Sequence, residues 1–91
     1  MIDSKAPPQV VSPNANVLLT EMPDRTGLLL DLRSKAYYTL NSSAVLLWKK
    51  IGSPREVVEE LSTRYAQPIQ IVERDVTELM QEFIAEGLVD V

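Results

Sequence analysis

The sequence contains neither cysteine nor histidine among its 91 residues. These absences remove thiolate nucleophiles, the commonest general base and the usual zinc ligands. The three glycines are scattered, so no glycine-rich phosphate loop is formed, and no Ser-x-x-Lys arrangement occurs. A catalytic site would have to be built from Asp, Glu, Lys, Ser or Tyr. We therefore expect a protein that is not an enzyme and that has no metal site and no cofactor.

Long apolar runs are missing as well. No stretch approaches the roughly 18 apolar residues of a membrane-spanning helix. The first five residues, "MIDSK", also lack the apolar core of a signal peptide. Apolar residues make up 45% of the chain and charged residues 24%, which is ordinary for a soluble globular protein. We expect one small cytoplasmic domain that does not contact a membrane, and the lack of cysteine fits that compartment.

The pattern along the chain begins with a tail. Residues 1–16 hold three of the six prolines and show neither a strand period nor a helix period. They predict a flexible N-terminal tail, which leaves residues 17–91 as the folded domain. Three short strand-like runs follow at residues 16–22, 28–32 and 36–40. Because short turn sequences connect them, we expect an antiparallel meander.

Three helical patterns come after the strands. Asn41 or Ser42 can cap the first, and "SPRE" at residues 53–56 has the pattern of a capping box with proline at the first helical position. The third runs from about residue 72 to residue 86 and is stopped by Gly87. Three strands followed by three helices predict an α+β winged helix-turn-helix domain.

Winged helices commonly bind DNA, so the charge of the third helix matters. The formal net charge of the chain is −4, and residues 71–91 contain six acids and one base, Arg74. A helix in the major groove must neutralise phosphates with Lys or Arg. We therefore expect no nucleic-acid partner.

The third predicted strand, residues 36–40, is uncharged and free of proline. In a meander this strand is a sheet edge. Natural edge strands are normally protected from pairing by charged residues or proline, and this strand has neither. An unprotected edge can accept an extended peptide as an added strand. Tyr37 and Tyr38 point to opposite faces. Leu40 shares a face with Tyr38 and favours Tyr38 as the inner residue, but the choice stays open.

The third helix offers an apolar wall for such a peptide. Val72, Val76, Leu79 and Phe83 cluster in a narrow arc, which is typical of a core-facing stripe. Met80 and Ile84 widen the arc to roughly 140°, more than a core stripe requires. We expect these two side chains to form a pocket beside the third strand, where the flexibility of methionine suits a peptide.

The run "LLLDLRSKAYYTLNSSAVLLWKKI" at residues 28–51, followed by "RDVTELMQEFIAEGLV" at residues 74–89, resembles the PqqD-like peptide chaperones, or RiPP recognition elements. The similarity covers about residues 17–91 and is greatest to the stand-alone members that serve lasso-peptide biosynthesis. It implies a winged-helix protein that binds the leader of a ribosomally made precursor peptide as a strand added to the third strand. It further implies delivery of that leader to a separate leader peptidase and then to an ATP-dependent cyclase.

The expected site combines the turn before the third strand, that strand and the facing wall of the third helix. Its residues are Arg33, Lys35, Ala36, Tyr37, Tyr38, Thr39, Leu40, Val76, Leu79, Met80, Phe83 and Ile84. Two alternatives remain. One is a carrier for the precursor peptide of a radical enzyme in quinone-cofactor synthesis, and the other is a winged-helix DNA-binding regulator.

Overall fold

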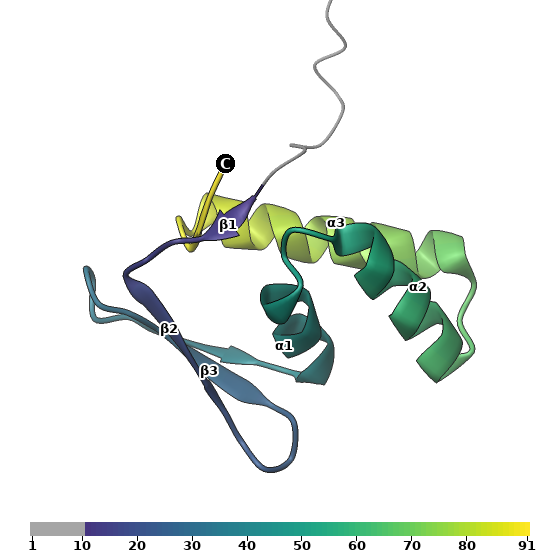
Figure 1. The fold of residues 1–91 in the computed structure, drawn as a ribbon, viewed down its shortest axis with the longest axis horizontal. Coiled ribbons are helices and arrows are strands. Elements are labelled where there is room, and N and C mark those ends of the chain that lie inside the picture. Colours follow the sequence, from purple (N-terminus) through teal and green to yellow (C-terminus); the bar gives the residue numbers. More distant parts are fainter. Residues whose placement is uncertain (1–10) are drawn as a thin grey trace, which may run out of the picture.

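The computed structural model describes residues 11–91, so the first ten residues of the predicted tail lie outside the described part. The elements in chain order are β1 (Ser12–Pro13), β2 (Val17–Glu21), β3 (Gly27–Asp31), β4 (Tyr37–Leu40), α1 (Ser42–Lys49), α2 (Pro54–Tyr65), α3 (Ile69–Ala85) and β5 (Val89–Asp90). Figure 1 shows the sheet on one side of α1 and the long helix α3 running past both. The predicted α+β architecture, a three-stranded antiparallel sheet followed by three helices, is confirmed.

The sheet has the order β2-β3-β4, and each neighbouring pair is antiparallel. Leu29 at its centre pairs with Leu19 on β2 and with Tyr38 on β4, and it is completely buried. Its neighbours Leu28 and Leu30 lie on the opposite face and are only partly buried. The helices therefore cover one face of the sheet, and β4 is an edge strand within residues 11–91.

The helix starts follow the sequence signals only in part. The Asn41 side chain accepts the Ala44 amide at 2.9 Å, so the predicted cap of α1 is formed. Pro54 begins α2 as predicted, but the Ser53 side chain makes no capping hydrogen bond. The capping box expected at residues 53–56 is therefore wrong. α3 begins at Ile69, before the predicted start at residue 72. The sequence pattern missed this first turn because its residues are exposed and do not belong to the apolar stripe.

The end of α3 is a Schellman motif. Gly87 has the left-handed φ of +72°, its N–H donates to the Ile84 carbonyl, and the Leu88 N–H donates to the Phe83 carbonyl at 3.0 Å. The predicted stop at Gly87 is confirmed. A left-handed residue here is what turns the chain out of the helix and into β5.

Residues 11–16, which the sequence assigned to the tail, lie against the domain. β1 pairs with β5, joining Pro13 to Val89, and the Asn14 N–H donates to the Leu88 carbonyl at 3.0 Å. Val11 is 5% exposed and belongs to the core. A two-residue strand is too short to display a period in the sequence, so the pattern gave no sign of this second small sheet.

The core lies between the inner face of the sheet and the three helices, with α1 at its centre. Trp48 on α1 is buried. Its ring packs edge to face against the ring of Phe83 on α3, with 5.5 Å between the two ring centroids. Such a pair adds about 0.5–1.5 kcal/mol beyond the burial of its area. This contact fixes α3 relative to α1 and thereby sets where the helix stands in relation to β4.

Candidate functional site

A groove of ≈ 810 Å³ separates the β4 edge from α3, and we call it the β4–α3 groove. Its lining is Tyr38, Thr39, Leu40, Asn41, Ser43, Ala44, Leu61, Tyr65, Gln67, Val72, Asp75, Val76, Glu78, Leu79, Glu82, Phe83 and Leu88. Apolar side chains from β4, α1, α2 and α3 form much of this lining. Such a surface suits a ligand that presents apolar side chains and an extended backbone together.

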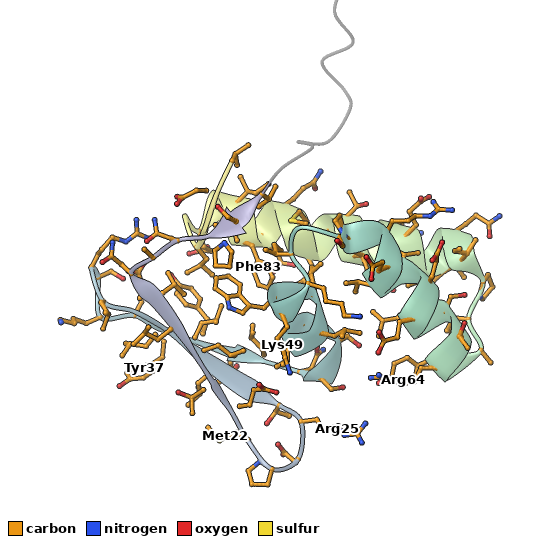
Figure 2. All side chains as sticks on the ribbon, in the orientation of Figure 1. Met22, Arg25, Tyr37, Lys49, Arg64 and Phe83 are labelled. Atoms are coloured by element: carbon orange, nitrogen blue, oxygen red, sulfur yellow. The ribbon has the colours of Figure 1, made fainter. Side chains whose placement is uncertain are left out.

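The two tyrosines of β4 take opposite sides of the sheet. Tyr38 is partly buried and packs on the core, whereas Tyr37 is 67% exposed on the face away from the helices. Figure 2 shows Tyr37 pointing outward and Phe83 lying between α3 and the sheet. The preference for Tyr38 as the inner residue, suggested by the face it shares with Leu40, agrees with this arrangement.

The backbone of β4 has one side available for pairing. Asp31 and Ala36 stand opposite each other where the β3–β4 register continues. The Asp31 N–H donates to the Ala36 carbonyl at 3.0 Å, so these two residues form a hydrogen-bonded cross-strand pair. Antiparallel ladders alternate, so the pairs of Tyr38 and Leu40 with β3 should also be hydrogen-bonded. The backbone groups of Tyr37 and Thr39 then point away from β3, toward the open edge.

A hydrogen bond ties β4 to the end of α3. The Tyr38 hydroxyl donates to the Glu86 carboxylate at 3.2 Å. Burial raises the pKa of Tyr38, and the carboxylate raises it further. The phenol therefore remains a protonated donor at neutral pH, and the bond holds the two walls together at one end of the groove.

Arg33 also engages α3. Its guanidinium binds the Asp31 carboxylate at 2.9 Å and 3.0 Å, and Nη2 donates to the Gly87 carbonyl at 2.8 Å. The Arg33 guanidinium holds the pKa of the Asp31 carboxyl below its ordinary value. Arg33 thus links the turn after β3 to the Schellman motif and does not line the groove. Lys35 is exposed at the left-handed φ of 65° in the same turn, next to Ala36.

The α3 residues of the predicted site divide between two grooves. Val76, Leu79 and Phe83 line the β4–α3 groove, as expected, and Val76 also borders the groove on the other side of the helix. Met80 and Ile84 instead line a second groove on the other side of the helix, which we call the α2–α3 groove. Consecutive helical residues are about 100° apart, so Leu79 and Met80 cannot face the same wall. These two were expected to adjoin β4, and the structure does not bring them there.

The groove contains polar residues that the sequence patterns did not single out. Asp75, Glu78 and Glu82 come from the α3 face that includes Leu79. Tyr65 of α2 is 49% exposed, and its hydroxyl lies 3.5 Å from Ser42 Oγ. Helical periodicity around Leu79 could have identified the acids, whereas Tyr65 depends on how α2 is placed against α1.

Within residues 11–91, no three His, Cys, Asp or Glu side chains are grouped so as to hold a metal ion. None of the helices formed by these residues combines the length and apolar character needed to cross a bilayer.

Comparison with known structures finds two close matches in shape. The chain is similar to a solved structure described as lasso peptide synthetase B1 complexed with the leader peptide, with a TM-score of 0.79 and 25% identity over 89% of this chain and 98% of that one. It also resembles TbiB1 in complex with the TbiA(beta) leader peptide, with a TM-score of 0.77 and 21% identity over 87% of this chain and 94% of that one.

A comparison with curated proteins finds no match. The family model described as coenzyme PQQ synthesis protein D (PqqD) matches residues 27–89, from β3 to β5. This span includes β4, all three helices and the whole β4–α3 groove. The resemblance to PqqD-like recognition elements is therefore confirmed, and the chain belongs to the PqqD family.

Proposed function

We propose that this protein binds the leader segment of a ribosomally synthesised precursor peptide of the lasso type. The leader pairs as an added strand with the open edge of β4, and its inward side chains enter the β4–α3 groove. The observation that carries this proposal is the unprotected edge of β4 beside a largely apolar groove. Edge pairing supplies affinity through backbone hydrogen bonds, and the groove supplies specificity through side chains.

The comparison with lasso peptide synthetase B1 supports the choice of ligand. That structure is a complex with a leader peptide, and it matches this chain over nearly its whole length. The proposed contacts here are the backbone of Tyr37 and Thr39 and the side chains of Val76, Leu79 and Phe83.

The protein acts as a carrier and not as an enzyme under this proposal. It holds the leader for a leader peptidase and then a cyclase, which perform the chemistry. No cofactor, membrane or nucleic acid takes part, and the compartment is the cytoplasm. The acids of α3 support the exclusion of nucleic acid, because phosphate binding requires Lys or Arg at the contact.

A second candidate is a carrier for the precursor peptide of quinone-cofactor synthesis. The description of the matching family model, coenzyme PQQ synthesis protein D, favours it. The same groove would serve, and the difference lies in the peptide. A peptidase gene and a cyclase gene beside this one would favour the first proposal, a carrier for a lasso-type precursor.

The test is a titration with a fluorescent leader peptide taken from the precursor gene next to this one, with random duplex DNA as the control. The proposal predicts saturable sub-millimolar peptide binding that unlabelled leader competes away, and no binding of DNA. Absence of peptide binding together with salt-sensitive DNA binding would refute the proposal and indicate a winged-helix DNA-binding regulator instead.

A further inference from the structure

The charged side chains that line the β4–α3 groove are all acidic. They are Asp75, Glu78 and Glu82 of α3, and no Lys or Arg lines this groove. All three are exposed. Among the described residues, the ion pairs of this protein involve other acids, on β2, β3, α2 and the first turns of α3. The groove therefore combines an apolar lining and an open strand edge with a rim of one charge sign.

Within this acidic row like charges repel one another, and the one basic residue of α3, Arg74, lies four residues before Glu78. Glu78 and Glu82 are four residues apart, and Glu86 continues the row by the same step, so like charges are neighbours. Glu82 and Glu86 also stand in or next to the last turn of α3, where the helix dipole favours positive charge, and that turn contains no basic residue. Glu86 has a structural role, because it accepts the Tyr38 hydroxyl. Within the described part of the chain, Glu78 and Glu82 take part in no ion pair.

We propose that the β4–α3 groove selects a cationic leader, one with Lys or Arg at alternate positions whose side chains meet Glu78 and Glu82. This inference rests on the proposed function and specifies its substrate class. Two acids one turn apart are separated by about 6 Å along a helix. Alternate residues of a strand are about 6.8 Å apart. Two cations on the inner face of an added strand can thus each face one acid, while the Leu79 side of the groove receives apolar side chains.

The experiment compares two peptides and three proteins. The peptides are the labelled leader encoded beside this gene and the same leader with each Lys replaced by Gln and each Arg by citrulline. The proteins are the wild type, the double variant Glu78→Gln/Glu82→Gln, and the control Glu56→Gln/Glu59→Gln. The control residues are exposed acids of α2 outside the groove, and their replacement changes the net charge equally.

Exposed ion pairs contribute a few tenths to about 1 kcal/mol each, so two pairs predict that Glu78→Gln/Glu82→Gln weakens leader binding about fivefold. The neutralised leader should bind the wild type more weakly by a similar factor and should not distinguish the three proteins. Added salt should reduce binding of the natural leader to wild type and control alike. Thermal unfolding of each variant checks that the fold is intact.

Two results would overturn the inference. Equal affinity of the wild type for both peptides would refute the cationic preference while leaving leader binding in place. An equal loss in the α2 control would assign the effect to net charge and not to the groove. If the wild type binds neither peptide, the proposed function itself fails, which separates the two conclusions.

Discussion

Asp31 is the one charged side chain that is buried among residues 11–91, at 4% exposure. It accepts hydrogen bonds from the guanidinium and the backbone N–H of Arg33. Arg33 in turn donates to the Gly87 carbonyl at the end of α3. Removing the carboxylate would leave the guanidinium with the Gly87 carbonyl as its remaining partner and loosen the link between the turn after β3 and α3. The carboxylate is buried but the Arg33 side chain is 45% exposed, so water offsets part of the loss on the arginine side.

The first prediction concerns Asp31→Asn and pH. Because the folded pKa of Asp31 is held below its ordinary value near 4, the carboxylate stabilises the fold above that value, and this contribution is lost as the pH falls through the folded pKa. The variant should have a lower free energy of unfolding than the wild type at pH 7. Urea unfolding followed by Trp48 fluorescence measures it.

The same pair of proteins supplies the control. At a pH low enough to protonate Asp31 in the folded state, the difference between wild type and Asp31→Asn should shrink. A difference that stays constant from pH 7 into strong acid would show that the carboxylate charge does not stabilise the fold.

Residue type alone gave little guidance about Arg33. Two basic residues at a turn, Arg33 and Lys35, were expected to contact a peptide. The structure engages Arg33 internally, because Asp31 lies two residues earlier and Gly87 is brought near by the fold. Only the first of these partners is visible in the sequence, and even that spacing is common in exposed turns.

At the scale of elements, β4 and α3 define the proposed site. The sequence predicted the strand within one residue of its start and correctly marked Val72, Val76 and Phe83 as core-facing. It could not assign Met80 and Ile84, because α3 is flanked by two grooves and a helical stripe does not reveal which neighbour covers each side. That choice depends on how α2 and the sheet pack, which is set by contacts far apart in the chain.

The division of α3 between two grooves gives a prediction with a built-in control. Leu79→Glu places a charge inside the β4–α3 groove, where it meets apolar side chains, and should weaken leader binding at least about tenfold, the equivalent of 1.4 kcal/mol. Met80→Glu, one residue later, points into the α2–α3 groove and should leave binding nearly unchanged.

Fluorescence titration of both variants with the leader peptide measures this difference, and thermal unfolding reports the fold. Both positions are partly buried, so the two substitutions carry similar risk to stability. Stronger loss of binding in Met80→Glu than in Leu79→Glu would move the peptide to the α2–α3 groove.

At the scale of the whole molecule, the order of the elements was predictable from the sequence, whereas one strand pairing was not. Three strands before three helices were readable because turns and helix ends are marked by short motifs, such as Asn41 and Gly87. The pairing of β1 with β5 was not readable, since it joins two-residue strands from opposite ends of the chain. The ligand was suggested by family resemblance, and the open edge of β4 supplies a physical reason for it.

The measurement that tests the central claim most directly is amide hydrogen exchange of β4, observed by NMR with and without the leader peptide. Strand addition predicts that the Tyr37 and Thr39 amides, which point to the open edge, exchange more slowly in the saturated complex. The amides of Tyr38 and Leu40, already paired with β3, should change little. Binding of the leader that leaves the exchange of Tyr37 and Thr39 unaltered would contradict pairing at this edge.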